Sequence, residues 1–413
     1  MTSDDRRLSY ILGIPSFALS LSIAVLSTYL PVLARKFTSS TSVIGLLVGG
    51  EGLIAVLLPV WIGRLSDRSV TRLGRRIPFL LGAAPFAALA LVLLPFAGSL
   101  GAMALEVFLF YLAYFTYYSP YRALYPDLIS TQAAARAQGI QGVFTGAGLG
   151  VALVGGGFLL ELWRPLPYFV GAGLLLAATL IVTVMVPHGI APMSMPESRA
   201  SSPFADLWGL LKGDRAINQF VIGNALLTLA LGGMKSFVVL WLTEGLGKSI
   251  NFTAGAMVVV ALGTVVGALV AGKLGDRDGP AQVLNLALFI FGIGLIVGTF
   301  TTSIWLLGIA FPVIALCGGA AFALPYAVLL RMTPSKKHGM VAGLFDASSG
   351  MGTLLGPALT GFAIDILRPV FPSTRGYAAM WPVLSISILC SMLILRRAAA
   401  NRKPVEEVEA ISA

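Results

Sequence analysis

The sequence predicts an all-α integral membrane protein with twelve transmembrane helices, arranged as two six-helix halves in parallel repeat. Three observations lead to this prediction: charged residues are scarce, apolar runs of spanning length recur, and one charged motif occurs twice. Asp, Glu, Lys and Arg make up only 11% of the 413 residues, whereas the hydrophobic set reaches 57%. Soluble proteins carry about 25% charged residues. This chain is therefore expected in a lipid bilayer, and its composition excludes a soluble enzyme, a disordered chain, a disulfide scaffold, collagen and a coiled coil.

Apolar runs divide the chain into twelve candidate spans. A helical span needs about 20 apolar residues, and with a short loop each crossing uses about 34. The first six runs cover 9–34, 42–63, 77–98, 102–121, 138–160 and 166–187, and the second six cover 216–243, 251–272, 281–301, 304–330, 339–365 and 377–395. The segment 188–215 between them is rich in Pro and Ser. We therefore predict an N-terminal half at 1–187, a linker at 188–215, and a C-terminal half with its tail at 216–413.

Basic residues predict the orientation of these spans. Most of the 28 Lys and Arg fall on one side when both termini and the linker are placed there. Lys and Arg are enriched in cytoplasmic loops, so both termini and the linker are predicted to be cytoplasmic. The net charge of +10 is then a topology signal and not a nucleic-acid-binding patch. Short loops and a short tail favour a bacterial inner membrane.

An internal repeat relates the two halves. The motif G-x-L-x-D-R occurs as Gly63–Arg68 after the second run and as Gly272–Arg277 after the eighth, 209 residues later. The same offset carries Arg122 onto Arg331. A fixed offset between matching loops indicates two parallel repeats, an arrangement that places a substrate site near the bilayer midplane between them.

These motifs resemble the major facilitator superfamily. The first copy is expanded to S-D-R-x-x-T-R-x-G-R-R-x-P-F at Ser66–Phe79, which resembles the glycoside–cation symporters and their sucrose-transporter-like branch. The segment Arg122–Leu128 resembles the R-A-L-x-x-D-L element of that branch. The resemblance implies a secondary active transporter that works by alternating access, without enzymatic activity and as a monomer.

The repeated motif is predicted to act as a gate. Gly63 and Gly272 permit a tight turn or a close backbone approach at a helix end. Asp67 and Asp276 are placed to meet the positive N-terminal end of a neighbouring helix. The resemblance implies that each carboxylate latches a helix of the other half, the run at 339–365 for Asp67 and that at 138–160 for Asp276.

Arginines around the motif are predicted to form salt bridges. Asp127 lies in a loop that faces a group of arginines, Arg68, Arg72, Arg75 and Arg76. A salt-bridge latch is expected there, and it must be breakable because both access states need to be populated. The alternative for these arginines, and for Arg122 and Arg277, is simple anchoring on the cytoplasmic side.

Three charged residues lie within the predicted spans: Glu51, Lys235 and Asp346. Ionisable groups at this depth are costly and mark functional sites by default. One cation and two anions can neutralise each other in a shared cavity, and Glu51 is the candidate carrier of a coupling proton. The alternative is a structural ion pair. Glu106, Glu161 and Glu244 lie near outer span ends and are predicted to form a solvated rim.

Tyrosines recur on one face of the run at 102–121. Tyr111, Tyr114, Tyr118 and Tyr121 are spaced i, i+3, i+7 and i+10, which places them along one side of a helix. The resemblance implies that this span lines the cavity, so Tyr111 and Tyr114 are candidates for stacking on a flat ligand. An interfacial aromatic belt is the alternative and suits Tyr118 and Tyr121. Asn224, Thr228 and Tyr326 are further candidates for lining the cavity.

Glycines cluster in the runs at 138–160 and 339–365, where small residues at helical spacing predict close helix packing. Neither a phosphate-binding loop nor metal-ligand spacing is present in the sequence, so no cofactor is expected. The leading prediction is proton-coupled import of a small polar solute such as a sugar or glycoside. The alternatives are a proton-coupled exporter of amphipathic compounds and a non-transporting membrane assembly or pigment-handling factor on the same fold.

Overall fold

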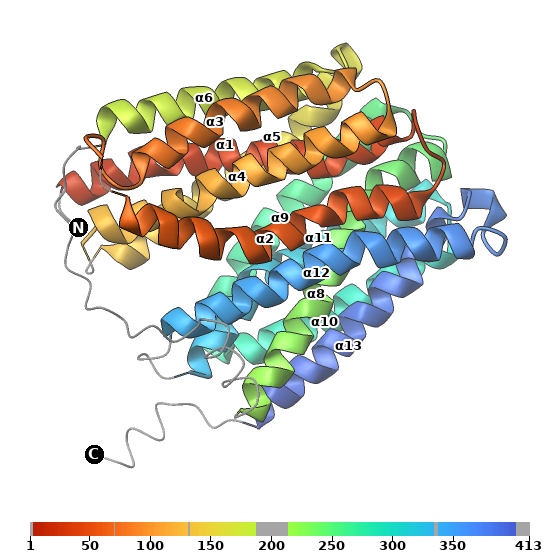
Figure 1. The fold of residues 1–413 in the computed structure, drawn as a ribbon. Helices are drawn as coiled ribbons and strands as arrows, with labels where there is room; N and C mark the ends of the chain where they lie inside the picture. The colour runs from red at the N-terminus through yellow and green to blue at the C-terminus, as the bar shows by residue number, and fades with distance from the viewer. Residues whose placement is uncertain (1–2, 70, 131–132, 187–213, 334–337, 402–413) are drawn as a thin grey trace. The chain divides into compact units, whose positions relative to one another are not determined.

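The computed structural model describes residues 3–69, 71–130, 133–186, 214–333 and 338–401. Within these ranges the chain forms long helices and no strand (Figure 1). Nearly all of the predicted linker at 188–215 lies outside the described residues. The first six helices are α1 (Ser3–Ala34), α2 (Thr41–Arg68), α3 (Ile77–Leu93), α4 (Leu100–Leu128), α5 (Ala134–Leu162) and α6 (Leu166–Met185). The second six are α8 (Arg215–Leu240), α9 (Ile250–Asp278), α10 (Pro280–Phe300), α11 (Ile304–Arg331), α12 (His338–Ile366) and α13 (Met380–Ala400).

Each predicted span corresponds to one of these helices. Eleven of the described helices are long and apolar enough to cross a membrane. The twelfth, α12, matches α9 in length at 29 residues, but frequent glycine, serine and threonine lower its hydropathy. Most helices are longer than the apolar runs that predicted them, because a helix can continue past the hydrocarbon layer into polar surroundings. These helices confirm the predicted all-α membrane architecture.

The described chain forms two compact units. Unit 1 comprises Met1–Ser39, Leu53–Pro196 and Ser249–Val258, and unit 2 comprises Ser40–Gly52, Glu197–Lys248 and Val259–Ala413. Helices α2 and α9 are therefore each divided between the units. The first turns of α2 belong with α8 to α13, and the first turns of α9 belong with α1 to α6. The boundaries predicted at 188 and 215 stay a prediction.

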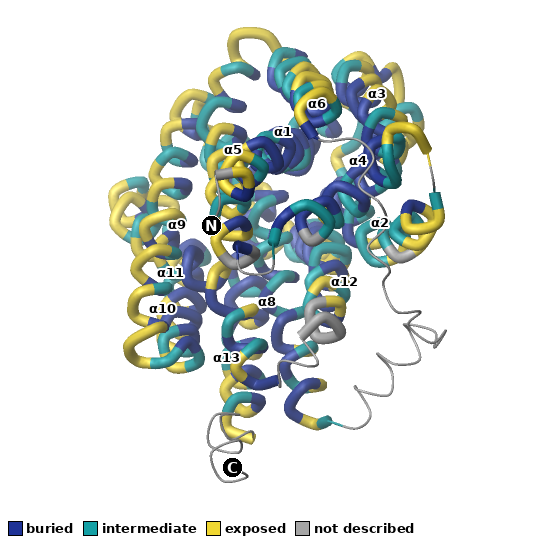
Figure 2. Tube along the Cα trace, turned by 90° about the vertical axis from the view of Figure 1, so that its left-hand side faces the viewer, coloured by how far each residue is buried: buried dark blue, intermediate teal, exposed yellow. Residues whose placement is uncertain are grey.

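Unit 1 is organised around α1. This helix packs against α5 and α6, while α3 packs against α4 and α6. Leu12, Leu26 and Leu30 of α1 are completely buried, and the α1 tube is largely in the buried colour in Figure 2. Gly148 of α5 lies against the backbone of α1 at Phe17, where a methyl group would collide with the carbonyl oxygen. The predicted close packing at 138–160 is confirmed at this position.

Unit 2 is organised around α8. This helix packs against α12 and α13, and α10 packs against α11 and α13. Gly352 and Gly356 of α12 meet the α8 backbone at Ala225 and Leu229, and a methyl group at either glycine would overlap backbone atoms. The glycines predicted to permit close packing at 339–365 therefore bring α12 against α8, which positions the polar residues of both helices.

Candidate transport site and gating network

Glu51 lies in the middle of α2, within the part of that helix that belongs to unit 2. On either side of it, Gly49 and Gly52 lie against the α12 backbone, at Leu354 and Gly350. Side chains at these glycines would separate the two helices. Lys235, on α8 of the same unit, has a coulombic interaction with the Glu51 carboxylate. Two of the three charges that the sequence placed inside the membrane therefore lie in the same unit, and no ion pair joins them among the described residues.

A second polar group lies on α8 and α12, and it centres on the buried Asn224. The Asn224 amide nitrogen donates to the Ser348 hydroxyl at 2.7 Å and to the Ser349 hydroxyl at 3.0 Å. The Thr228 hydroxyl donates to the main-chain carbonyl oxygen of Asn224 at 2.8 Å. The side-chain oxygen of Asn224 is buried, and it has no hydrogen-bond partner among the described residues. We call Asn224, Thr228, Ser348 and Ser349 the Asn224 cluster.

Asp346 and Tyr326 lie next to the Asn224 cluster. Tyr326 on α11 contacts the Phe345 ring edge-on, with ring centroids 5.2 Å apart, and the exposed Asp346 follows Phe345. Along α8, Asn224 precedes Lys235 by about 16 Å of helical rise. The three intramembrane charges thus divide between two levels: Lys235 acts on Glu51, while Asp346 lies with the Asn224 cluster.

The tyrosines of α4 pack within unit 1. Tyr111 and Tyr114 are buried and contact the Phe110 ring at 5.9 and 5.7 Å. Tyr114 is stacked on Tyr118, with centroids 5.8 Å apart and an interplanar angle of 15°, so these two tyrosines share one helix face. Neighbouring rings take up much of this face, and a ligand-stacking role for Tyr111 and Tyr114 stays a prediction.

Tyr121, at the end of the stripe, is not part of an interfacial belt. Its hydroxyl is buried and bonds to Ser16 and to the Leu12 carbonyl of α1. The belt interpretation is wrong for this residue because its hydroxyl is buried between two helices and hydrogen-bonded to α1. Tyr118 is half-buried, and the Arg122 guanidinium lies 5.7 Å from its ring centroid.

Arg75 and Arg76 form the salt bridges predicted with Asp127 in unit 1, and their role as a latch stays a prediction. Arg76 contacts Asp67 at 2.6 Å and Asp127 at 3.1 Å, and it donates to the Ser66 hydroxyl at 2.6 Å. Arg75 approaches Asp127 at 3.8 Å. We call these five residues the Arg76 cluster. Its centre is well shielded, since the Arg76 side chain is only 9% exposed. The cluster ties the end of α2 and the following loop to α4.

The repeated motif lies on helices and not in loops. Gly63–Arg68 forms the last turns of α2, and Gly272–Arg277 forms the last turns of α9. The predicted tight turn at Gly63 and Gly272 is therefore wrong. A methyl group at Gly63 would lie 3.4 Å from the Ser119 hydroxyl, an ordinary contact, and one at Gly272 would meet no described atom within 4 Å.

The chain turns after the motif instead, at Gly74 and Gly279, with φ of 86° and 90°. Only glycine adopts this left-handed backbone readily. The helices simply extend beyond the apolar runs before they reach these turns.

The second copy of the motif is exposed. Asp276 has no ion pair within the described part of the chain, and Arg277 bonds only its neighbour Asp278 at 3.2 Å, with 81% of the arginine side chain exposed. Arg68 is exposed as well. The predicted latching of Asp67 and Asp276 onto the other half stays a prediction.

Asp365 is a residue that the sequence analysis missed. It lies at the end of α12 and accepts hydrogen bonds from the first residues of α2, all within unit 2. The donors are the Ser40 hydroxyl at 2.8 Å, the Thr41 amide at 3.0 Å and hydroxyl at 2.7 Å, and the Ser42 amide at 2.8 Å and hydroxyl at 2.7 Å. We call this arrangement the Asp365 clasp. The signal in the sequence was the Ser-Thr-Ser run, whose residue types favour helix N-termini.

The fold defines a multi-pass helical membrane protein in which one charged motif occurs at the ends of two helices. The sequence model described as the Major Facilitator Superfamily matches residues 12–261 and again 220–413. The chain therefore belongs to the major facilitator superfamily, and it is a membrane transporter and not an enzyme.

Similar proteins support this membership. The chain is 26% identical over 376 residues to the uncharacterized MFS-type transporter YceJ of Bacillus subtilis, covering 90% of this chain and 93% of that protein. It is 27% identical over 261 residues to the multidrug resistance protein MdtG of Citrobacter koseri, covering 60% and 63%. The crystal structure of the nucleoside transporter NupG has the same fold, with a TM-score of 0.75 at 16% identity over 97% of this chain and 100% of that one.

Proposed function

We propose that this protein is a proton-coupled transporter that imports a small polar solute, with Glu51 as the proton-binding residue. The observation that carries the proposal is the buried side-chain oxygen of Asn224, which has no partner among the described residues. A buried acceptor that lacks a donor costs about 1–3 kcal/mol. A solute that offers a hydroxyl or amide proton would recover this energy on binding.

The Asn224 cluster suits a solute with several hydroxyl groups. It presents one free acceptor together with the Ser349 hydroxyl, which accepts from Asn224 and can also donate, whereas the Ser348 hydroxyl already donates to the Phe345 carbonyl at 2.8 Å. The Tyr326 ring, 38% exposed, contacts Phe345 on α12 and offers an apolar surface. A sugar or glycoside combines hydroxyls with an apolar ring face, and the Ser66–Phe79 segment resembles the symporters that carry such solutes.

The charge pair supplies the proposed coupling. Ionised Glu51 is attracted to Lys235, and a proton on Glu51 removes that attraction. Protonation of Glu51 therefore changes the energy difference between two conformations if the distance from Glu51 to Lys235 differs between them. Such a change in relative energy is required for protonation to shift the populations of the two conformations. The bacterial relatives and the basic-residue pattern favour an inner-membrane protein with both termini in the cytoplasm.

Export of amphipathic compounds is the second candidate. It is favoured by the likeness to MdtG, whose name describes a multidrug resistance protein. The same charge pair would serve an exporter, with proton entry driving the solute outward.

The experiment is transport by the full chain in proteoliposomes. With an inward proton gradient, wild type is expected to accumulate one of a panel of sugars and glycosides. Glu51→Gln is expected to lose gradient-driven accumulation by at least tenfold while it retains solute counterflow, because glutamine keeps the shape but cannot titrate. Asn224→Ala is expected to raise KM, and Glu161→Gln, a change at an exposed glutamate on α5, serves as the matched control.

Two results would contradict the proposal. If Glu51→Gln accumulates solute as wild type does, Glu51 is not the coupling site. If only lipophilic compounds move, and they move outward, the exporter replaces the importer.

A further inference from the structure

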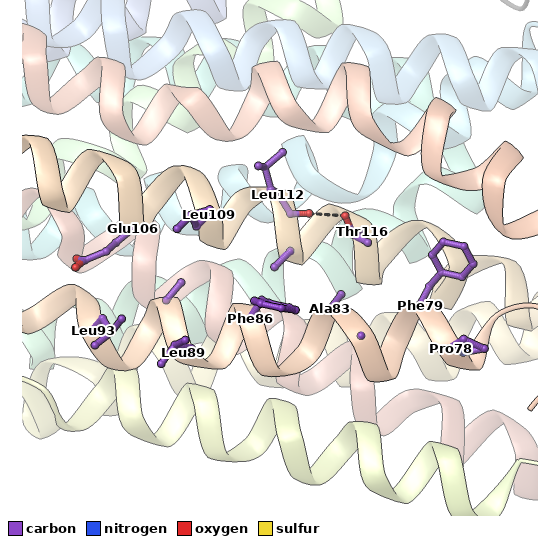
Figure 3. Close-up of a pocket in the computed structure, with 13 residues that line it drawn as sticks. Pro78, Phe79, Ala83, Phe86, Leu89, Leu93, Glu106, Leu109, Leu112 and Thr116 are labelled. Carbon is purple, nitrogen blue, oxygen red and sulfur yellow. Dashed lines mark hydrogen bonds between the residues drawn. The ribbon is translucent and has the colours of Figure 1, made fainter.

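A long apolar groove runs between α3 and α4 in unit 1, away from the residues discussed above. Its volume is about 490 Å³. Figure 3 shows its walls, which extend from Pro78 and Phe79 at one end of α3 to Leu93 at the other. Fifteen residues of helical rise separate Pro78 from Leu93, about 22 Å. The groove is thus longer than one hydrocarbon leaflet is thick, since the whole core measures about 30 Å and one leaflet about 15 Å.

The groove opens toward the surroundings of the helices. Phe86, Leu89 and Leu109 line it and remain 68%, 53% and 46% exposed. Thr116 also lines it, but its hydroxyl donates to the Leu112 carbonyl at 2.7 Å and is therefore already satisfied. In a membrane, such exposed apolar walls face lipid tails.

Glu106 is the one acidic residue that lines the groove. Its side chain lies at the Leu93 end in Figure 3, between α3 and α4. The Oε2 atom is buried and has no hydrogen-bond partner within the described part of the chain. The prediction that Glu106 belongs to a solvated rim is wrong for this oxygen, because it is not accessible to solvent. A buried carboxylate oxygen without a hydrogen-bond donor is unfavourable, and a cationic partner would stabilise it.

The depth of Glu106 matches that of a lipid headgroup. Glu106 lies about 9 Å of helical rise after the first residue of α4. The whole of α4 is about 43 Å long, about 13 Å longer than the hydrocarbon core of about 30 Å. Glu106 is then close to the boundary between headgroups and acyl chains. On the predicted topology this is the outer leaflet.

We propose that this groove binds a phospholipid whose headgroup ends in a primary ammonium, as in phosphatidylethanolamine. One acyl chain lies along the apolar walls, and the ammonium donates a hydrogen bond to Glu106. The length of the groove favours an acyl chain over a compact ligand. The carboxylate disfavours phosphatidylglycerol, which lacks a cation. Phosphatidylcholine lacks the N–H donor that the Glu106 oxygen requires.

The test is native mass spectrometry of the full chain from mixed micelles that contain equal amounts of the three lipids. Wild type is expected to retain phosphatidylethanolamine about tenfold over either competitor, which corresponds to one charge-assisted hydrogen bond. Glu106→Gln is expected to abolish the preference, with Glu161→Gln as the matched control.

A second variant tests the acyl-chain part of the site. Gly82 lines the groove, and a methyl group built there meets no atom within 4 Å. Gly82→Leu is therefore expected to fill the groove without strain and to reduce retention of phosphatidylethanolamine about tenfold. Gly173→Leu, at an equally open glycine of α6, is expected to retain lipid as wild type does.

Two outcomes would overturn the proposal. One is equal retention of the three lipids by wild type, or an unchanged preference in Glu106→Gln. The other is binding of tetraphenylphosphonium that Glu106→Gln abolishes while lipid retention stays the same, which would assign the groove to a free lipophilic cation.

Discussion

Helices α2 and α9 occupy equivalent positions in the two repeats, yet they are held in different ways. The first turn of α2 receives the Asp365 carboxylate from α12, and its last turn joins the Arg76 cluster. The first turn of α9 is capped locally, by the Ser249 hydroxyl that accepts from the Phe252 amide at 3.2 Å. Its last turn, with Asp276 and Arg277, is exposed. Polar side chains of other elements bind both ends of α2, whereas among the described residues the hydrogen bonds at the start of α9 are local and the end of α9 is exposed.

The connections that follow the two helices explain the difference at their last turns. Eight residues, Ser69–Arg76, join α2 to α3 and carry the arginines of the cluster, whereas Gly279 alone joins α9 to α10. A single glycine cannot supply a cation to return to Asp276. The shared motif therefore determines the position of its residues at the end of each helix, but it does not determine their contacts. The partners of these residues come from connecting segments that differ between the two repeats.

The largest expected effect that tests this contrast comes from Arg76→Ala. Removal of one partner from a shielded charge cluster leaves carboxylates without compensation and costs about 3 kcal/mol. We expect a clearly lower midpoint of thermal unfolding in detergent, followed by tryptophan fluorescence.

Arg277→Ala is the matched change in the other repeat. Its side chain is 81% exposed, so the midpoint should stay within error of wild type. Equal effects of the two variants would show that the repeats are held alike.

Asp365→Ala is expected to have the next largest effect. It removes the acceptor for two backbone amides and three hydroxyls at the start of α2 and should destabilise unit 2 by about 2 kcal/mol. Hydrogen exchange measured peptide by peptide should show faster exchange in the first turns of α2.

Ser249→Ala is the control for this clasp. It removes only a local cap and should cost about 1 kcal/mol or less, with faster exchange confined to the start of α9. If Asp365→Ala leaves exchange in α2 unchanged, the clasp does not hold the helix.

Asp67→Asn is expected to have the smallest effect. The Asp67 side chain is 57% exposed, and exposed ion pairs contribute about 0.2–1 kcal/mol. The loss should shrink further at about 1 M salt, where the Debye length falls to about 3 Å. The measurement is the unfolding midpoint at low and high salt.

Asp276→Asn should change the midpoint at neither salt concentration. A salt-dependent change in Asp276→Asn equal to that in Asp67→Asn would contradict the difference between the two gate motifs.

Much of the fold was predictable from residue types alone. Apolar runs located every helix because the hydrocarbon core imposes length and composition on a span. The glycines in α5 and α12 predicted close helix contacts, since only the absence of a side chain permits them. The pairing of Asp127 with Arg75 and Arg76 followed from opposite charges confined to one end of neighbouring helices.

Other features had no local signature. The Asp365 clasp joins residues more than 320 positions apart, so neither partner reveals the other. Burial of the Glu106 oxygen depends on how α3 covers α4, and the packing of Tyr121 against α1 depends on a third helix. Such contacts arise only when the helices are assembled.

The sequence by itself determined that the chain is a twelve-helix membrane protein built from a repeat, because the bilayer restricts what a span can contain and the motif survives in both halves. The tertiary structure decided which polar groups meet: Arg76 contacts two carboxylates, and Asp365 accepts hydrogen bonds from the start of α2. The physical reason is that hydropathy acts on each segment separately, whereas a hydrogen bond or ion pair requires two segments to be placed within a few ångströms.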